Sequence, residues 1–229
     1  MKRTSNILTG VLIAATAALM PLALWMAFLY APDEKVMGAV QRVFYFHVPA
    51  AIVSFASTFV MLGASMGYLW TRRRGFDRVS LAATELALFF CTVVLVTGPI
   101  WARPAWGVWW TWEARLTTTL VLWLLLAACL MVRRYAENPD QGARLASVLG
   151  IVAALDVPII YKAVEWWRGQ HPVVFGPGKR DAMDPQMKQT FLVCLLVFFV
   201  LYALMLALRT RLASLEDRVR DLAESAAAR

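Results

Sequence analysis

The sequence is poor in charged residues. Only 17% of its 229 residues are Asp, Glu, Lys or Arg, and 60% are hydrophobic. A soluble domain of ordinary composition would be about 25% charged. The composition therefore excludes an ordinary soluble domain. It predicts an integral membrane protein with one membrane domain and no room for a second large one.

Cysteine and histidine are also scarce. The three cysteines lie inside apolar runs, and none belongs to a CxxC pair, so we expect buried core residues rather than a disulfide, a thiolate metal site or a redox motif. The chain has two histidines, His47 and His171. With no cysteine to join them, a zinc site would need carboxylates to complete it.

Long apolar runs define the expected fold. The first is too long for the apolar region of a signal peptide, which has about 7–15 residues, so we expect it to be retained as a membrane helix. We predict an all-α membrane domain over residues 1–208, followed by a cytoplasmic amphipathic tail over 209–229. The six expected transmembrane helices cover residues 7–30, 50–70, 80–100, 116–132, 145–166 and 191–208.

The net charge of +8 has a membrane explanation rather than a nucleic-acid one. Arg72, Arg73 and Arg74 follow the second run, and Arg133 and Arg134 end the fourth. Basic residues beside short spans favour the cytoplasmic side. We therefore expect both termini in the cytoplasm and the connection between the third and fourth helices on the opposite, outer face.

That connection is rich in tryptophan. Five of the ten tryptophans lie between Trp101 and Arg115, and we expect a loop over about residues 101–116. Tryptophan collects at membrane interfaces, but such a belt accounts for only one or two residues per helix end. A cluster of indoles instead favours a surface for a large, flat, apolar ligand.

The same outer face receives both histidines. His47 precedes the second apolar run and His171 follows the fifth. Two imidazoles beside an aromatic platform suit the axial ligation of haem iron, although each histidine alone could be an ordinary interfacial residue. Arginines on this face could pair with the haem propionates or with lipid phosphate. The candidates are Arg42, Arg103, Arg115 and Arg168.

Two acidic residues fall within apolar runs. Glu85 lies in the third run, and Asp156 lies in the fifth, two residues before Pro158. Intramembrane carboxylates are costly and usually face the interior of a helix bundle. A structural contact inside the bundle and a proton path both remain open for them.

Three motifs resemble a known family. Trp106-Gly-x-x-Trp110-x-Trp112-Glu113 resembles the tryptophan-rich WWD signature of haem-handling membrane proteins. Phe46-His47-Val48-Pro49 resembles the histidine motif before their second helix. Glu165-Trp166-Trp167-x-x-x-His171 resembles the motif after their later helix. Together, over about residues 41–199, they are similar to the six-span cytochrome c maturation protein C family. Glu113 departs from the signature, which usually has aspartate there.

The resemblance implies a haem-binding scaffold rather than an enzyme. Members hold haem b non-covalently at the outer face of the bacterial inner membrane and present it to a periplasmic haem chaperone. Their other partners are the ATPase and membrane subunits of an ABC transporter and a small single-span protein. Here the implied axial ligands are His47 and His171. The implied haem contacts are Trp106, Trp109, Trp110, Trp112, Glu113, Arg115, Arg42, Arg103, Trp166, Trp167 and Arg168.

Two other functions remain as alternatives. A membrane b-type cytochrome would place histidines within its spans to stack haems across the bilayer. A haem permease would need a site near the middle of the membrane, often with broken helices and polar residues, for which Glu85, Asp156 and Pro158 are the only candidates.

Overall fold

The computed structural model describes residues 2–169, 171–172 and 183–227, and it is built from helices. Each of the six long helices in these residues is long and apolar enough to cross a membrane, which confirms the expected all-α architecture. No strand occurs in the described ranges apart from an isolated bridge between Glu34 and Gly38. The helices are α1 (Lys2–Trp25, continued by a π-helical turn, Met26–Tyr30), α2 (Phe44–Thr71), α3 (Arg74–Trp106), α4 (Ala114–Tyr135), α5 (Pro139–Trp167) and α6 (Pro185–Ala227).

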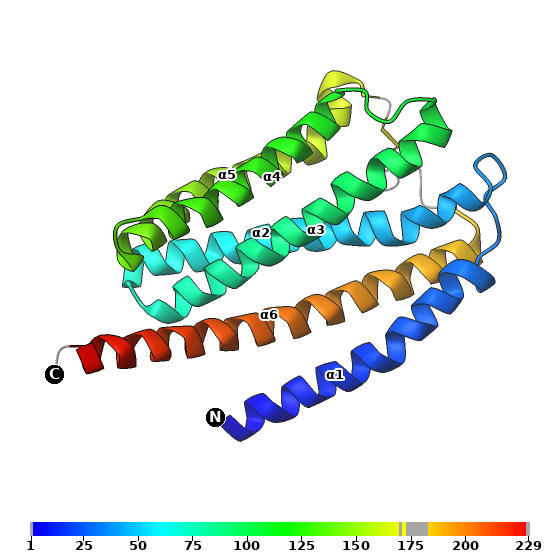
Figure 1. Cartoon of the computed structure of the whole chain (residues 1–229). Coiled ribbons are helices and arrows are strands. Elements are labelled where there is room, and N and C mark those ends of the chain that lie inside the picture. Colours follow the sequence, from blue (N-terminus) through cyan, green and yellow to red (C-terminus); the bar gives the residue numbers. More distant parts are fainter. Residues whose placement is uncertain (1, 170, 173–182, 228–229) are drawn as a thin grey trace.

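The helices run side by side, and α1 begins and α6 ends at the same end of the bundle (Figure 1). The α1–α2 connection, the α3–α4 connection and the end of α5 gather at the opposite end of the bundle. An even number of spans requires this arrangement. Which end faces the cytoplasm remains a prediction from the arginine distribution.

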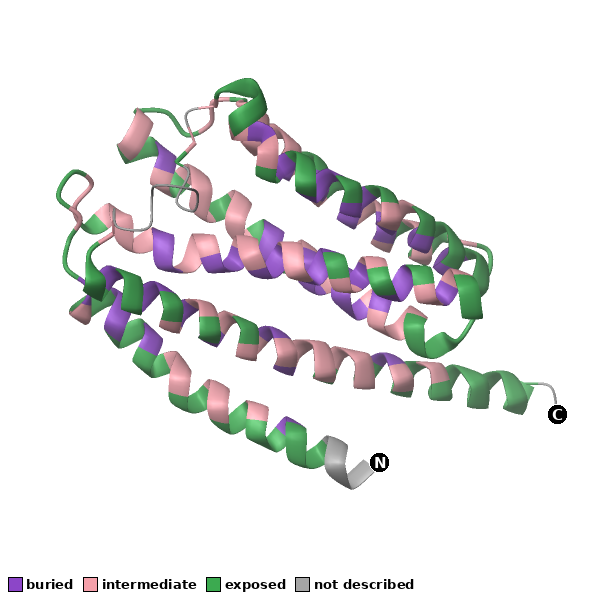
Figure 2. Cartoon of the chain, turned by 180° about the vertical axis from the view of Figure 1, so that it is seen from behind, coloured by how far each residue is buried: buried purple, intermediate pink, exposed green. Residues whose placement is uncertain are grey.

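Small polar residues join α2 to α3. Ser54 donates a hydrogen bond to the carbonyl of Ala87 at 3.0 Å, and Ser57 donates to that of Ala83 at 2.8 Å. Such bonds help membrane helices to associate, because the hydrophobic effect does not drive helices together inside a lipid bilayer. Figure 2 shows that buried residues concentrate on the facing sides of α2, α3 and α5, while much of α1 is exposed.

The expected end of the third helix at residue 100 is wrong. Helix α3 continues through Pro99 and Pro104 to Trp106, so the non-helical connection is limited to residues 107–113. A proline removes one helical N–H, but neighbouring groups in a membrane bundle can compensate for that loss. The helix ends instead at Gly107, which has φ +79° and donates its N–H to the carbonyl of Arg103 at 2.9 Å.

Helix α6 has no break at residue 208, where the tail was expected to begin. It runs on to Ala227, and its charged end pairs with the start of α3. Arg78 binds Asp217 at 2.7 Å, and Arg74 binds Asp221 at 2.9 Å. The apolar positions of this end, Leu212, Leu215, Val219 and Leu222, are exposed.

The two intramembrane acids have different surroundings. Glu85 is held by Arg209 of α6 through two hydrogen bonds, which makes it a contact between helices. Asp156 is buried in α5, and its Oδ2 has no hydrogen-bond partner in the described residues. The bundle contact considered for Glu85 is therefore present, whereas no described residue forms a hydrogen bond with Asp156 Oδ2 that would show a corresponding contact.

Candidate functional site

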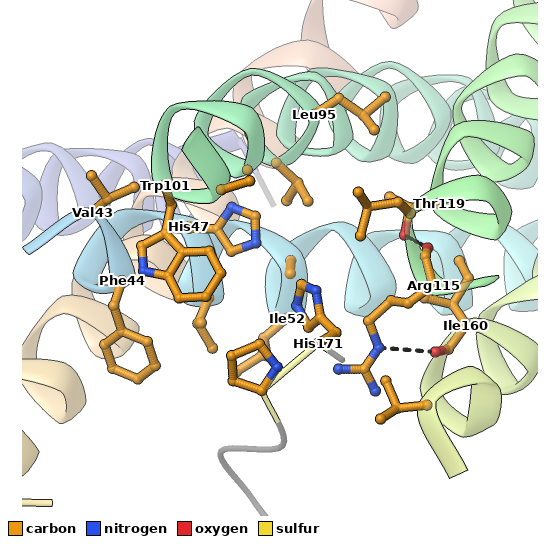
Figure 3. A pocket seen from close by; sticks show the side chains of 18 of the residues that line it. Val43, Phe44, His47, Ile52, Leu95, Trp101, Arg115, Thr119, Ile160 and His171 are labelled. Carbon is orange, nitrogen blue, oxygen red and sulfur yellow. Dashed lines mark hydrogen bonds between the residues drawn. The ribbon is translucent and has the colours of Figure 1, made fainter. Parts of the chain in front are cut away.

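A large cavity opens at the end of the bundle where the three connections gather (Figure 3). Its volume is about 900 Å³, and α2, α3, α4, α5 and the α1–α2 connection contribute to its wall. Most of the wall is apolar. The wall includes both histidines and several residues of the tryptophan-rich segment that the sequence indicated: His47, Trp101, Trp106, Trp110, Arg115 and His171.

His47 occupies the first turn of α2, and its ring faces the cavity. Its Nδ1 lies 2.8 Å from the hydroxyl oxygen of Thr97 on α3. A Cβ on Gly98 would lie 3.4 Å from the His47 ring, an ordinary van der Waals contact, so α3 lies close to the imidazole here. Sequence reasoning identified His47 but not Thr97, because the sequence does not show whether a threonine in a membrane helix bonds to its own helix or to a neighbouring one.

His171 enters the cavity from the segment after α5, and Glu113 holds that segment. The backbone N–H of His171 donates to Glu113 Oε2 at 3.3 Å. Its Nδ1 also lies 3.3 Å from Glu113 Oε1, which is close enough for an ion pair, but the two atoms do not form a hydrogen bond. A Cβ on Gly169 would lie only 2.6 Å from Glu113 Oε2. The carboxylate thus ties the α3–α4 connection to the chain beyond α5.

The tryptophans at the end of α3, in the α3–α4 connection and at the end of α5 divide into two groups. Trp101, Trp106 and Trp110 line the cavity, and the rings of Trp101 and Trp106 meet edge to face at 5.2 Å. Trp106 also meets the imidazole of His171 at 6.1 Å, and the indole Nε1 of Trp110 is buried with no hydrogen-bond partner in the described residues. Four others project outward with large exposed fractions: Trp109 (59%), Trp112 (70%), Trp166 (61%) and Trp167 (59%).

Trp101 belongs to the site although it was not among the expected haem contacts. It lies one helical turn after Thr97 and Gly98 on the same face of α3. The expected loop over about residues 101–116 placed Trp101 outside the helix, whereas α3 continues to Trp106.

Of the four candidate arginines, Arg115 alone lines the cavity formed by the described residues. It donates hydrogen bonds to the carbonyls of Ile160 at 3.3 Å and Tyr161 at 3.0 Å, which use two of the five N–H donors of its guanidinium group. Arg103 donates to the carbonyl of Gly107, and Arg168 is the exposed residue that caps α5 with φ +51°.

Arg42 belongs to the α1–α2 connection rather than to the cavity wall. It binds Asp33 at 2.8 Å and the carbonyl of Ala27 at 2.9 Å, near the end of the first membrane helix. In the same connection, Glu34 does line the cavity. Backbone N–H groups of Met37 and Val36 donate to its carboxylate and lower the pKa of Glu34, so this part of the rim carries a negative charge.

The arrangement of donors suits one class of metal compound. No group of three or more His, Cys, Asp or Glu side chains comes together as a metal site within the described ranges. Two imidazoles, one from α2 and one from beyond α5, nevertheless face one aromatic cavity. Such a pair can complete the coordination of a metal whose remaining ligands come from a flat macrocycle.

The comparison with protein families agrees with this chemistry. The family model described as "Heme exporter protein C" matches residues 1–225. The chain belongs to this family. The match confirms the resemblance that the tryptophan and histidine motifs indicate.

Curated relatives support the assignment over most of their length. A "Heme exporter protein C" of Bradyrhizobium diazoefficiens is 34% identical over 212 residues, which cover 92% of this chain and 80% of the relative. The protein of that name from Rhodobacter capsulatus is 31% identical, covering 96% of this chain and 94% of its own. That of Escherichia coli is 31% identical, covering 80% and 74%.

Proposed function

We propose that this protein binds haem b non-covalently in the cavity and serves as a haem-binding membrane scaffold in cytochrome c maturation. His47 and His171 act as the axial ligands of the iron. One observation carries the proposal: the two histidines of the chain, which lie at the start of α2 and just beyond α5, line a single cavity together with Trp101, Trp106 and Trp110. The name of the relatives supports haem as the ligand.

The cavity has suitable dimensions and surfaces for haem. Its volume of about 900 Å³ is near the upper end of the range for small-molecule pockets, roughly 300–1,000 Å³. Indole rings supply wide apolar contact for a porphyrin face. The Arg115 guanidinium, which has donors beyond the two bonded to α5, pairs with a propionate. When bound, haem supplies the iron and the conjugated macrocycle, and the protein holds and orients it.

The outward tryptophans have a different role in this proposal. Trp109, Trp112, Trp166 and Trp167 surround the cavity end without lining the cavity itself. They contact the lipid interface and the periplasmic haem chaperone that receives the cargo. Arg42, Arg103 and Arg168 support the connections or contact lipid phosphate. The word "exporter" in the relatives' name supports assembly with other export components, here the ATPase and membrane subunits of an ABC transporter. The distribution of arginines supports a cavity on the periplasmic face of the bacterial inner membrane.

A haem permease is the second candidate, and one observation favours it. The cavity wall continues along α2 from Val48 through Ile52 and Phe55 to Phe59, about three helical turns toward the middle of the span. A cargo could follow this apolar surface. A b-type cytochrome with two bis-histidine haems is disfavoured, because the chain contains only two histidines.

Absorption spectra of the purified protein test the proposal. The wild type should give a six-coordinate bis-histidine haem spectrum with one haem per chain, and either His47→Ala or His171→Ala should disturb it. Trp70→Phe, at the opposite end of α2, is the control and should leave the spectrum unchanged. A spectrum indifferent to both histidine variants would refute the ligand assignment. Haem flux into liposomes that contain the protein alone would favour the permease.

A further inference from the structure

The hydrogen bond behind His47 has a defined direction. The Thr97 hydroxyl oxygen lies 2.8 Å from His47 Nδ1 and 2.7 Å from the carbonyl oxygen of Val93. A hydroxyl has one proton, and a carbonyl oxygen can only accept. The arrangement that satisfies both short contacts has the hydroxyl donating its proton to the Val93 carbonyl and accepting a proton from the imidazole. This arrangement places the imidazole proton on Nδ1.

We propose that Thr97 is a positioning residue that fixes His47 as the Nδ1–H tautomer and leaves the Nε2 lone pair free as the iron-binding atom. Its role toward iron rests on the proposed haem site, whereas the tautomer does not. In metal sites a hydrogen bond to one ring nitrogen commonly sets the tautomer and orientation that expose the other. Here the partner is a neutral hydroxyl that is already engaged by its own helix.

The packing around the ring supports this role. His47 and Thr97 come from different helices, α2 and α3, which Ser54 and Ser57 also join. On the α3 side, a Cβ built on Gly98 would lie 3.4 Å from the ring, so this part of α3 lies close to the imidazole. Rotation of the ring would break the Thr97 bond. The contact restricts both the position of the proton and the direction of the ring.

Nitrogen NMR of isotope-labelled histidine tests the tautomer without haem. In the haem-free His171→Ala protein His47 is the only imidazole, so its two ring nitrogens can be assigned directly. At a pH where the ring is neutral, Nδ1 should carry the proton. Thr97→Ser should preserve this state, and Thr97→Val should shift the ring toward the Nε2–H form. Thr84→Val is the matched control, because Thr84 is buried on α3 and bonds to its own helix in the same way.

Haem titration of the otherwise wild-type chain gives a second readout. Loss of the hydrogen-bond partner of a metal-binding histidine typically lowers metal affinity by about 10–100-fold. We expect a loss of that size for Thr97→Val and near-normal affinity for Thr97→Ser and Thr84→Val. An Nε2–H tautomer in the parent protein, or an Nδ1–H tautomer that survives Thr97→Val, overturns the proposal. Because the tautomer is measured without haem, this failure is distinguishable from failure of the proposed haem site.

Discussion

Replacing Gly169 with alanine should detach Glu113 from the His171 segment without unfolding the protein. The new Cβ would lie 2.6 Å from Glu113 Oε2, closer than two such atoms can remain. The colliding atom is the end of a flexible side chain, so the carboxylate can move away at little cost to the helix bundle. Its movement breaks the hydrogen bond that it accepts from the backbone N–H of His171.

The size of the effect follows from that bond. A hydrogen bond to a charged group contributes about 1.5–3 kcal/mol, and a length of 3.3 Å places this one at the lower end. If His171 must be held in place to bind iron, Gly169→Ala should weaken haem binding by about tenfold, since 1.4 kcal/mol corresponds to one such factor. Thermal stability of the haem-free protein should change little.

A double-mutant cycle isolates the collision. Haem titrations would compare Gly169→Ala, Glu113→Ala and the double variant. In the Glu113→Ala background the colliding atom is absent, so Gly169→Ala should have no further effect. Gly63→Ala on α2, where a Cβ would meet nothing within 4 Å, is the control for a glycine replacement as such. Equal losses for Gly169→Ala with and without Glu113 would refute the reasoning.

Three further substitutions separate the cavity from its scaffold. Trp101→Leu should weaken haem binding several-fold in a titration, whereas Trp70→Leu, whose side chain is 91% exposed at the far end of α2, should not; equal effects would contradict the assigned cavity wall. Ser57→Ala removes the bond to Ala83 and should destabilise the protein by about 0.6 kcal/mol in reversible unfolding in detergent. Arg78→Ala breaks the partly exposed pair with Asp217 and should cost less than about 1 kcal/mol, with haem affinity retained; a large loss of affinity would show that the end of α6 acts on the site.

The number of membrane helices and the meeting of the histidines followed from elementary rules. Apolar runs of sufficient length indicate spans, and successive spans cross the bilayer in alternate directions. Connections one, three and five must therefore meet at one end. His47 lies at the end of the first connection, and His171 lies in the fifth connection, just after the fifth helix. This counting predicts that both histidines lie at one end of the bundle, whereas the cavity that they share is set by the packing of α2 to α5.

The division of the tryptophans could not be predicted in the same way. Which indole lines the cavity depends on where α3 ends, and the apolar run that defines the span stops at residue 100, before the helix does. It also depends on Trp112, which adopts φ +54° and turns outward. A positive φ in a tryptophan is imposed by the surrounding connection rather than by its own preference. Composition places the indoles in one region, but backbone geometry decides which of them face the ligand.

The glutamate that departs from the family signature is explained by the contact it makes. Glu113 lies at the start of α4, yet its carboxylate reaches the backbone of Gly169 and His171 beyond α5. Glutamate is one methylene longer than the usual aspartate, and the missing side chain of Gly169 makes room for that extra reach. The two residues therefore form a complementary pair across the end of the bundle.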